Sequence, residues 1–131
     1  MRLTMRQLVS TGSPFETVAG YSRAAADGPW CFVSGTTGYD YATMTMPGDV
    51  SAQAENAMAT IARALEDAGF AMSDVVRVRY IVTDPGYADP VFSVVGRWFA
   101  DIRPAAMMIV AGLIRPEMKI EIEATALRNP A

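Results

Sequence analysis

The fold is decided by residues 103–127, which read RPAAMMIVAGLIRPEMKIEIEATAL. This stretch contains two β-rich segments, Ala105–Leu113 and Lys119–Leu127, and the Arg115-Pro116 step between them interrupts any continuous strand. We therefore predict two strands that are joined by a hairpin or by a tight strand-to-strand return.

The second segment has two chemically different faces, because successive strand side chains point to opposite sides. One face is suited to a core and the other carries carboxylates, so we expect a subunit contact or a small ligand on the carboxylate face. The core face comprises Ile120, Ile122, Ala124 and Ala126, and the other face Lys119, Glu121, Glu123 and Thr125.

Size and composition predict one domain over residues 1–131 that associates with itself. The chain is 51% hydrophobic and only 19% charged, which is little charge to cover a small domain. Burial of apolar surface between subunits would account for this composition.

Charge and residue usage exclude several classes of function. A net charge of −3 argues against a nucleic-acid binder, since such a protein needs a clustered basic surface. No apolar stretch reaches the ~20 residues of a membrane-spanning helix and no signal-peptide core is visible, so we expect a soluble cytoplasmic protein. The absence of histidine removes Ser-His and Cys-His nucleophiles, and the lone Cys31 lies in an apolar run typical of a buried thiol.

The remaining chain predicts three more strands before a helix, then one strand and a second helix. In the strand before the second helix, Val76, Val78, Tyr80 and Val82 alternate with Arg77, Arg79 and Ile81. The order β-β-β-α-β-α-β-β indicates an α+β fold with helices on one face of a mixed six-stranded sheet. The other predicted strands lie within Met1–Val9, at Tyr21–Ala26, Trp30–Ser34 and Val75–Thr83, and the helices at Asp49–Ala68 and Tyr87–Ala100. The first helix is predicted to be capped by Asp49 or Ser51 and to end at Gly69, and its apolar stripe comprises Val50, Ala54, Ala57, Ile61, Ala64, Leu65 and Ala68.

Five segments of the chain form a recognisable series in order and spacing: 19–24 (AGYSRA), 32–35 (FVSG), 74–78 (DVVRV), 103–105 (RPA) and 120–124 (IEIEA). Together they resemble the reactive intermediate deaminase (Rid) family, also called YjgF or L-PSP. The resemblance covers about Tyr21 to Leu127 and implies a chorismate-mutase-like fold, a homotrimer and clefts between subunits. It also implies hydrolysis of enamine or imine intermediates without metal or organic cofactor.

The chain departs from the family pattern where the resemblance places a carboxylate-binding arginine, directly after Pro-Ala. Ala106 stands there, Met108 follows at the next cleft position, and Phe92 replaces a frequent asparagine. Such a pocket should prefer a less charged, more apolar ligand. We assign Glu121 as the catalytic residue and place ligand contacts at Tyr21, Gly35, Thr36, Phe92, Ala106, Met108 and Arg115.

Two arginines are candidates for the missing cation, Arg79 and Arg115. The alternative for Arg79 is an ion pair with Glu121 or Glu123, and that for Arg115 is a solvated turn. Glu121 itself has a functional interpretation, contact with ligand or water, and a structural one, a pair with Arg79 or Lys119.

Three functions follow from these residues. The first is an enzyme in which Glu121 activates water for addition to a C=N bond. The second is a ligand-binding or scaffold trimer without chemistry. The third is the endoribonuclease attached to the L-PSP name, for which an acidic chain without histidine is poorly equipped.

Overall fold

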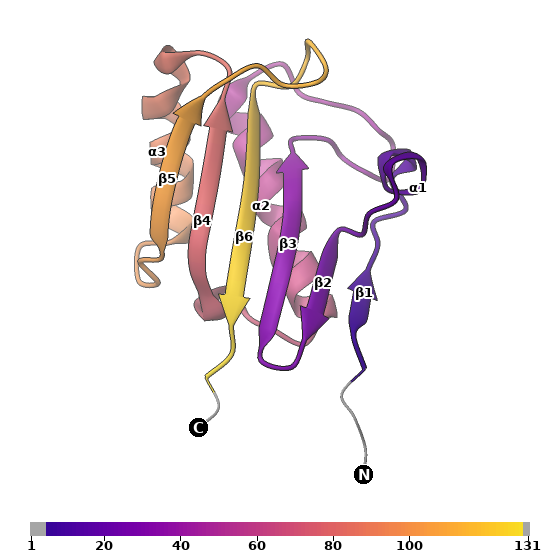
Figure 1. Cartoon of the computed structure of the whole chain (residues 1–131). Coiled ribbons are helices and arrows are strands. Elements are labelled where there is room, and N and C mark those ends of the chain that lie inside the picture. Colours follow the sequence, from indigo (N-terminus) through magenta and orange to yellow (C-terminus); the bar gives the residue numbers. More distant parts are fainter. Residues whose placement is uncertain (1–4, 130–131) are drawn as a thin grey trace.

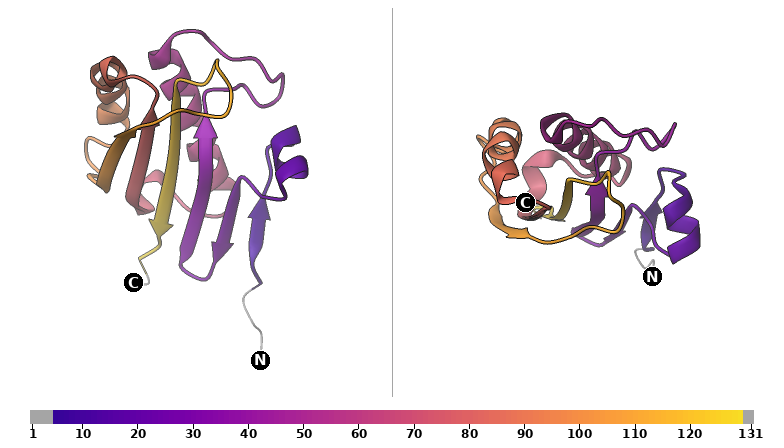
Figure 2. Two further views of the ribbon diagram at one scale, coloured as in Figure 1. Left: turned by 45° about the horizontal axis from the view of Figure 1, so that its top comes forward. Right: turned by 90° about the horizontal axis from the view of Figure 1, so that it is seen from above.

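A computed structural model describes residues 5–129, which form one six-stranded sheet with its two long helices on one face (Figures 1 and 2). The sheet order is β1-β2-β3-β6-β4-β5. Residues 1–4 of the first predicted strand lie outside the described residues. The strands are β1 (Gln7–Val9), β2 (Ala24–Asp27), β3 (Trp30–Thr37), β4 (Val75–Val82), β5 (Ala105–Val110) and β6 (Ile120–Leu127), and the helices α1 (Pro14–Ala19), α2 (Val50–Asp67) and α3 (Ala88–Trp98), with short 3₁₀ turns η1 (Met72–Asp74) and η2 (Pro85–Tyr87).

The predicted α+β fold and its mixed sheet are confirmed, but the predicted hairpin between the last two strands is wrong. β4 lies between β5 and β6, parallel to β5 and antiparallel to β6. The cause is the β4-α3-β5 unit, because a helical crossover returns the chain parallel to the strand it left. The link after β5 then passes over β4 to start β6 (Figure 1).

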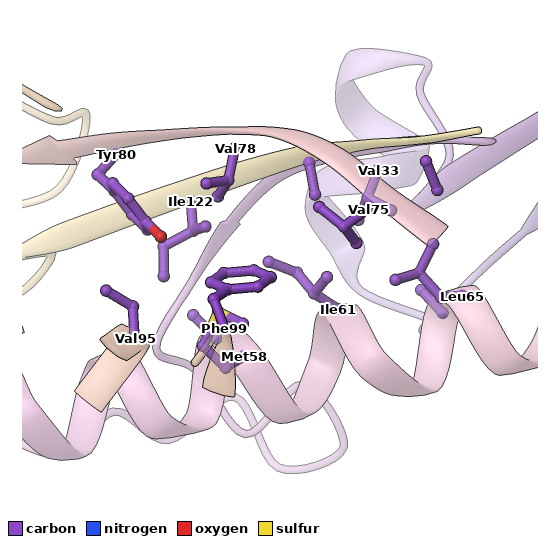
Figure 3. Packing of buried hydrophobic residues seen from close by; sticks show 14 of the residues in the cluster. Val33, Met58, Ile61, Leu65, Val75, Val78, Tyr80, Val95, Phe99 and Ile122 are labelled. Carbon is purple, nitrogen blue, oxygen red and sulfur yellow. The ribbon is translucent and has the colours of Figure 1, made fainter. Parts of the chain in front are cut away.

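The core lies between the sheet and helices α2 and α3 (Figure 3). The predicted apolar stripe of α2 is buried throughout, and Asp49 caps the helix by accepting a hydrogen bond from the Ala52 N–H at 3.0 Å. Gly69 ends it in the left-handed conformation at φ 84°. Figure 3 shows Val78, Tyr80 and Ile122 of the sheet facing Met58 and Ile61 of α2 and Val95 of α3.

One strand prediction is wrong in register. A bulge between Val75 and Arg77 changes the alternation of β4, so Val75 points into the core and Val76 is 42% exposed. From Val78 onward the predicted alternation holds, with Val78, Tyr80 and Val82 buried.

Helix α1 was not predicted, although its boundaries carry ordinary signals. Ser13 accepts a hydrogen bond from the Phe15 N–H at 3.2 Å, Pro14 occupies the first turn, and Gly20 ends the helix at φ 72°. Six residues are too few for an apolar periodicity to be visible in the sequence. The helix brings Glu16 into the interior.

Gln53 joins α2 to the start of β6. This buried side chain donates to the backbone oxygens of Pro47 and Glu117 at 2.8 and 3.0 Å, and accepts from the Lys119 N–H at 2.9 Å. The contact also brings the end of β3 against α2. A side-chain carbon on Gly38 would lie 2.5 Å from the Gln53 Cα, so only glycine fits there.

No helix within residues 5–129 is both long and apolar enough to cross a membrane.

We predict that Gly38→Ala lowers the free energy of unfolding by about 1–3 kcal/mol, because the added methyl group meets backbone that cannot rotate away. Urea denaturation at matched protein concentration measures the change. Gly48→Ala is the control, since nothing lies within 4 Å of the added carbon. Equal losses in the two variants would contradict the prediction.

Candidate functional site

The open face of the sheet, opposite the helices, contains a depression of about 300 Å³. Its floor combines apolar side chains of the β4 and β5 edge with the carboxylates of β6. It is lined by Gly35, Arg79, Ile81, Met107, Ile109, Glu121 and Glu123. A small organic molecule fits such a volume.

Glu121 lies directly over Gly35, at a break in the ladder between β3 and β6. The bulge between Val33 and Thr36 leaves Gly35 without a regular partner. A side-chain carbon there would lie 2.7 Å from the Glu121 Oε2 atom. Glycine at this position therefore leaves room for the carboxylate.

The electrostatic environment of Glu121 is mixed. Burial raises the pKa of Glu121 and the nearby Glu123 charge raises it further, whereas the Arg23 charge lowers it, with a net rise above the ordinary value. Within residues 5–129, Glu121 forms no hydrogen bond or ion pair with another side chain. The predicted structural pairs with Arg79 and Lys119 are therefore not formed.

Arg79 pairs across the strands with Glu123, which is one of the two partners predicted for it. Both groups are partly exposed, so the pair contributes little stability but neutralises both charges. Arg79 is thus not a free cation for a ligand.

A third arginine, which the sequence prediction missed, lies beneath this face. Arg23 is 0% exposed and its Nη1 donates to the Gly35 carbonyl at 2.9 Å and to the Thr36 hydroxyl at 3.1 Å. Its Nη2 donates to the Tyr21 hydroxyl at 3.4 Å. An isolated basic residue directly before the small residues of β2 was the available signal.

The predicted contacts Tyr21 and Thr36 therefore meet at Arg23. Thr36 is fully buried because the bulge in β3 turns its side chain inward, and it also donates to the Ser34 carbonyl. Tyr21 is partly exposed and can contact a ligand from the rim.

A second cluster contains three of the other predicted residues, Phe92, Ala106 and Met108. Phe92 and Ala106 line a shallow hollow of about 440 Å³ between α3 and β5, and Met108 packs partly buried against the core. Neighbouring strand residues Val78 and Tyr80 line this hollow, whereas Arg79 and Ile81 line the depression at Glu121. Alternation thus places the two clusters on opposite faces of the sheet, and one chain does not bring them together.

Arg115 belongs to neither cluster. It is exposed, and its guanidinium carbon lies 5.5 Å from the centre of the Phe15 ring. This position agrees with the alternative of a turn residue.

The fold closely matches those of solved proteins of one structural class. The structure superposes on Rv2704 of Mycobacterium tuberculosis, a member of the YjgF/YER057c/UK114 family, with a TM-score of 0.87 and 41% identity over 94% of this chain and 99% of that one. The YjgF gene product of E. coli superposes with a TM-score of 0.84 at 25% identity, over 94% and 99% of the two chains. The fold is therefore the chorismate-mutase-like α+β fold of these proteins.

The sequence then identifies the family. The model of the family described as Endoribonuclease L-PSP matches residues 11–128, so the chain belongs to that family. Protein DfrA of Myxococcus xanthus is 34% identical over 130 residues, which cover 97% of this chain and 99% of the relative. The 2-iminobutanoate/2-iminopropanoate deaminase of Bos taurus is 27% identical over 131 residues, covering 99% and 96%.

We predict that Glu121→Gln keeps the fold and gains stability relative to wild type as pH rises. Below the ordinary glutamate pKa the group is protonated in the folded and unfolded chain alike. The folded wild type holds the Glu121 proton more tightly than the unfolded chain does, because the pKa of Glu121 is raised in the folded state. The free energy of unfolding of the wild type therefore falls as pH rises through this raised pKa. The glutamine variant lacks this loss.

Urea denaturation of both proteins between about pH 4 and about pH 8 measures the difference, in which other titrating groups cancel. A variant that becomes less stable than wild type as pH rises would show instead that the ionised Glu121 is a structural ion-pair partner.

Proposed function

We propose that this protein binds, in a cleft between subunits, a small imine or enamine that lacks a free carboxylate, and hydrolyses it without a cofactor. The observation that carries the proposal is the Glu121 carboxylate, which lies half-buried over Gly35 with no side-chain partner among the described residues. A carboxylate kept in such a place needs a reason, and contact with water or ligand supplies one.

The chemistry proposed for Glu121 is general-base catalysis. Its carboxylate takes a proton from a water molecule while the water oxygen adds to the carbon of the C=N bond. The nitrogen gains a proton, and the tetrahedral adduct then releases ammonia and leaves a carbonyl compound. The relative in Bos taurus, named a 2-iminobutanoate/2-iminopropanoate deaminase, supports this class of reaction.

The proposed preference against carboxylates comes from the charges at the two clusters. Ala106 supplies no cation where the family resemblance places an arginine, and Arg79 is already paired with Glu123. Phe92 and Ala106 present an apolar surface instead. An anionic ligand would therefore lose water without gaining a partner, which is unfavourable.

The proposed cleft requires association, because the Glu121 depression and the Phe92 hollow lie on opposite faces of one chain. The open face also exposes large apolar side chains that a partner would cover. These include Met107 and Ile109 of β5 and the stacked pair Trp30 and Phe32 of β3, whose ring centres lie 6.0 Å apart.

We predict a homotrimer in solution, held by burial of this apolar face at roughly 25 cal/mol per Å² removed from water. Light scattering coupled to size exclusion should give about three times the chain mass of 14.1 kDa at micromolar concentration. Phe32→Asp should weaken the assembly, whereas the exposed Val18→Asp on α1 is the control. A wild-type mass equal to one chain would contradict the trimer and the shared cleft.

We predict that a neutral imine is hydrolysed with a higher kcat/KM than its carboxylate counterpart. The matched pair is 2-iminobutanoate and its carboxamide, which differ in charge at one group, and ammonia release measures both. A carboxylate that loses water without gaining a partner costs about 1–3 kcal/mol or more, which corresponds to roughly ten- to a hundredfold in favour of the amide.

Two variants test the roles separately. Glu121→Gln should lower turnover of the amide by roughly 10²–10⁴-fold, as expected for loss of a general base. Ala106→Arg should shift the preference toward the carboxylate. If neither compound is turned over, but the amide binds and Glu121→Gln weakens that binding, the protein is a ligand-binding trimer without chemistry. Cleavage of RNA by purified wild type but not by Glu121→Gln would favour the endoribonuclease.

A further inference from the structure

Arg23 is the only buried basic side chain within residues 5–129, and it takes no direct part in the proposed reaction. A buried guanidinium is costly unless its donors and its charge are compensated. Two of its nitrogens are hydrogen-bonded, whereas Nε is fully buried and has no hydrogen-bond partner. The groups around Arg23 show which charges it balances and which backbone it holds in place.

Glu16 of α1 provides one compensating charge. Its Oε2 atom lies 3.9 Å from the Arg23 Nε, and the side chain is only 6% exposed. Burial raises the pKa of Glu16, but hydrogen bonds from Thr11 and Ser10 and the charge of Arg23 outweigh it and lower the pKa below its ordinary value. Glu16 is therefore an ionised partner at neutral pH, at a distance too long for a hydrogen bond.

Two tyrosine rings complete the enclosure. The guanidinium carbon lies 4.6 Å from the centre of the Tyr41 ring and 5.6 Å from that of Tyr21. Aromatic faces at these distances stabilise a cation without hydrogen bonds. The planar fork is thereby held in one orientation, with its Nη1 against the Gly35 carbonyl.

Gly35 connects Arg23 to the site. Its carbonyl oxygen accepts from Arg23, and its Cα faces the Glu121 carboxylate so closely that a methyl group would not fit. The same peptide thus separates the buried cation from the half-buried anion. The groups that act on the charge of Glu121 are Arg23 beneath it and Glu123 beside it on β6, and Glu123 is neutralised by Arg79 of β4.

We propose that Arg23 is a positioning residue of this site, which holds the Gly35 peptide under Glu121 and provides the counter-charge of the Glu121 carboxylate from within the protein. The inference rests on the proposed role of Glu121 as a base. Because Arg23 is inaccessible, it does not bind the ligand itself. The charge that the depression presents is that of Glu121, so the site selects neutral or protonated, cationic imines and rejects anions.

The test is the titration of Glu121 by carbon NMR of protein labelled at the glutamate carboxyl carbons, with Glu121→Gln identifying the resonance. In Arg23→Gln, which removes the charge, the acid dissociation constant of Glu121 should fall roughly tenfold. Arg23→Lys retains the charge and should change it by less than about threefold. A purely structural role of Arg23 would leave the titration of Glu121 unmoved in a folded variant.

Arg97→Gln is the matched control, since it makes the same substitution at an exposed arginine of α3 that does not act on the charge of Glu121, and it should leave the Glu121 titration nearly unchanged. If Arg23→Gln fails to fold because Glu16 loses its counter-charge, the double variant Glu16→Gln and Arg23→Gln removes both buried charges together. The acid dissociation constant of Glu121 should fall in this double variant as well, whereas it should not fall in Glu16→Gln alone.

An unchanged Glu121 titration in the folded Arg23→Gln or double variant overturns the inference, even if neutral imines are hydrolysed. A tenfold fall supports it, even if no imine is hydrolysed, in which case only the proposed reaction fails. The two conclusions are therefore decided by different measurements.

Discussion

Strand β6 must satisfy two different environments at once, and the rest of the structure follows from that constraint. It is hydrogen-bonded to β3 on one side and to β4 on the other, so it cannot leave the middle of the sheet. Its buried face, with Ile120 and Ile122, packs toward the helices, and its other face carries Glu121 and Glu123. The site thus rests on a strand that is paired on both sides, which holds the carboxylate in position without a lid or a loop.

The fold was predictable where one local pattern decides the structure. The period-two alternation of β6 and the cap, stripe and terminal glycine of α2 each fix their own element, and all are confirmed. The hairpin between the last two strands could not be decided this way, because strand order depends on the crossover through α3. The bulge at Val76 is likewise set by pairing with β6 and leaves no mark in the alternation itself.

The site was predictable only in part, for a similar reason. Glu121 is a carboxylate on the open face of a strand whose other face is apolar, and this alternation can be recognised in the sequence. Arg23 lies far from Glu121 in the sequence and reaches the site only because β2, β3 and β6 lie next to one another in that order in the sheet. Its partner Glu16 lies on a six-residue helix that periodicity does not reveal. Buried charge networks of this kind depend on tertiary contacts, whereas pattern analysis works within one element.

The positions of the charges set what the site can bind. Arg79 is partly exposed but bound to Glu123, and Arg23 is enclosed by Glu16, the Gly35 carbonyl and two aromatic rings. Neither guanidinium can form the forked contact by which an arginine holds a ligand carboxylate. In the proposed reaction, a cation buried beneath the Gly35 peptide stabilises the ionised Glu121, whereas a cation on the cleft surface would stabilise an anionic substrate. Under the function that we propose, a positive charge inside the protein instead of on the cleft surface retains the means to activate water and changes which molecules can bind.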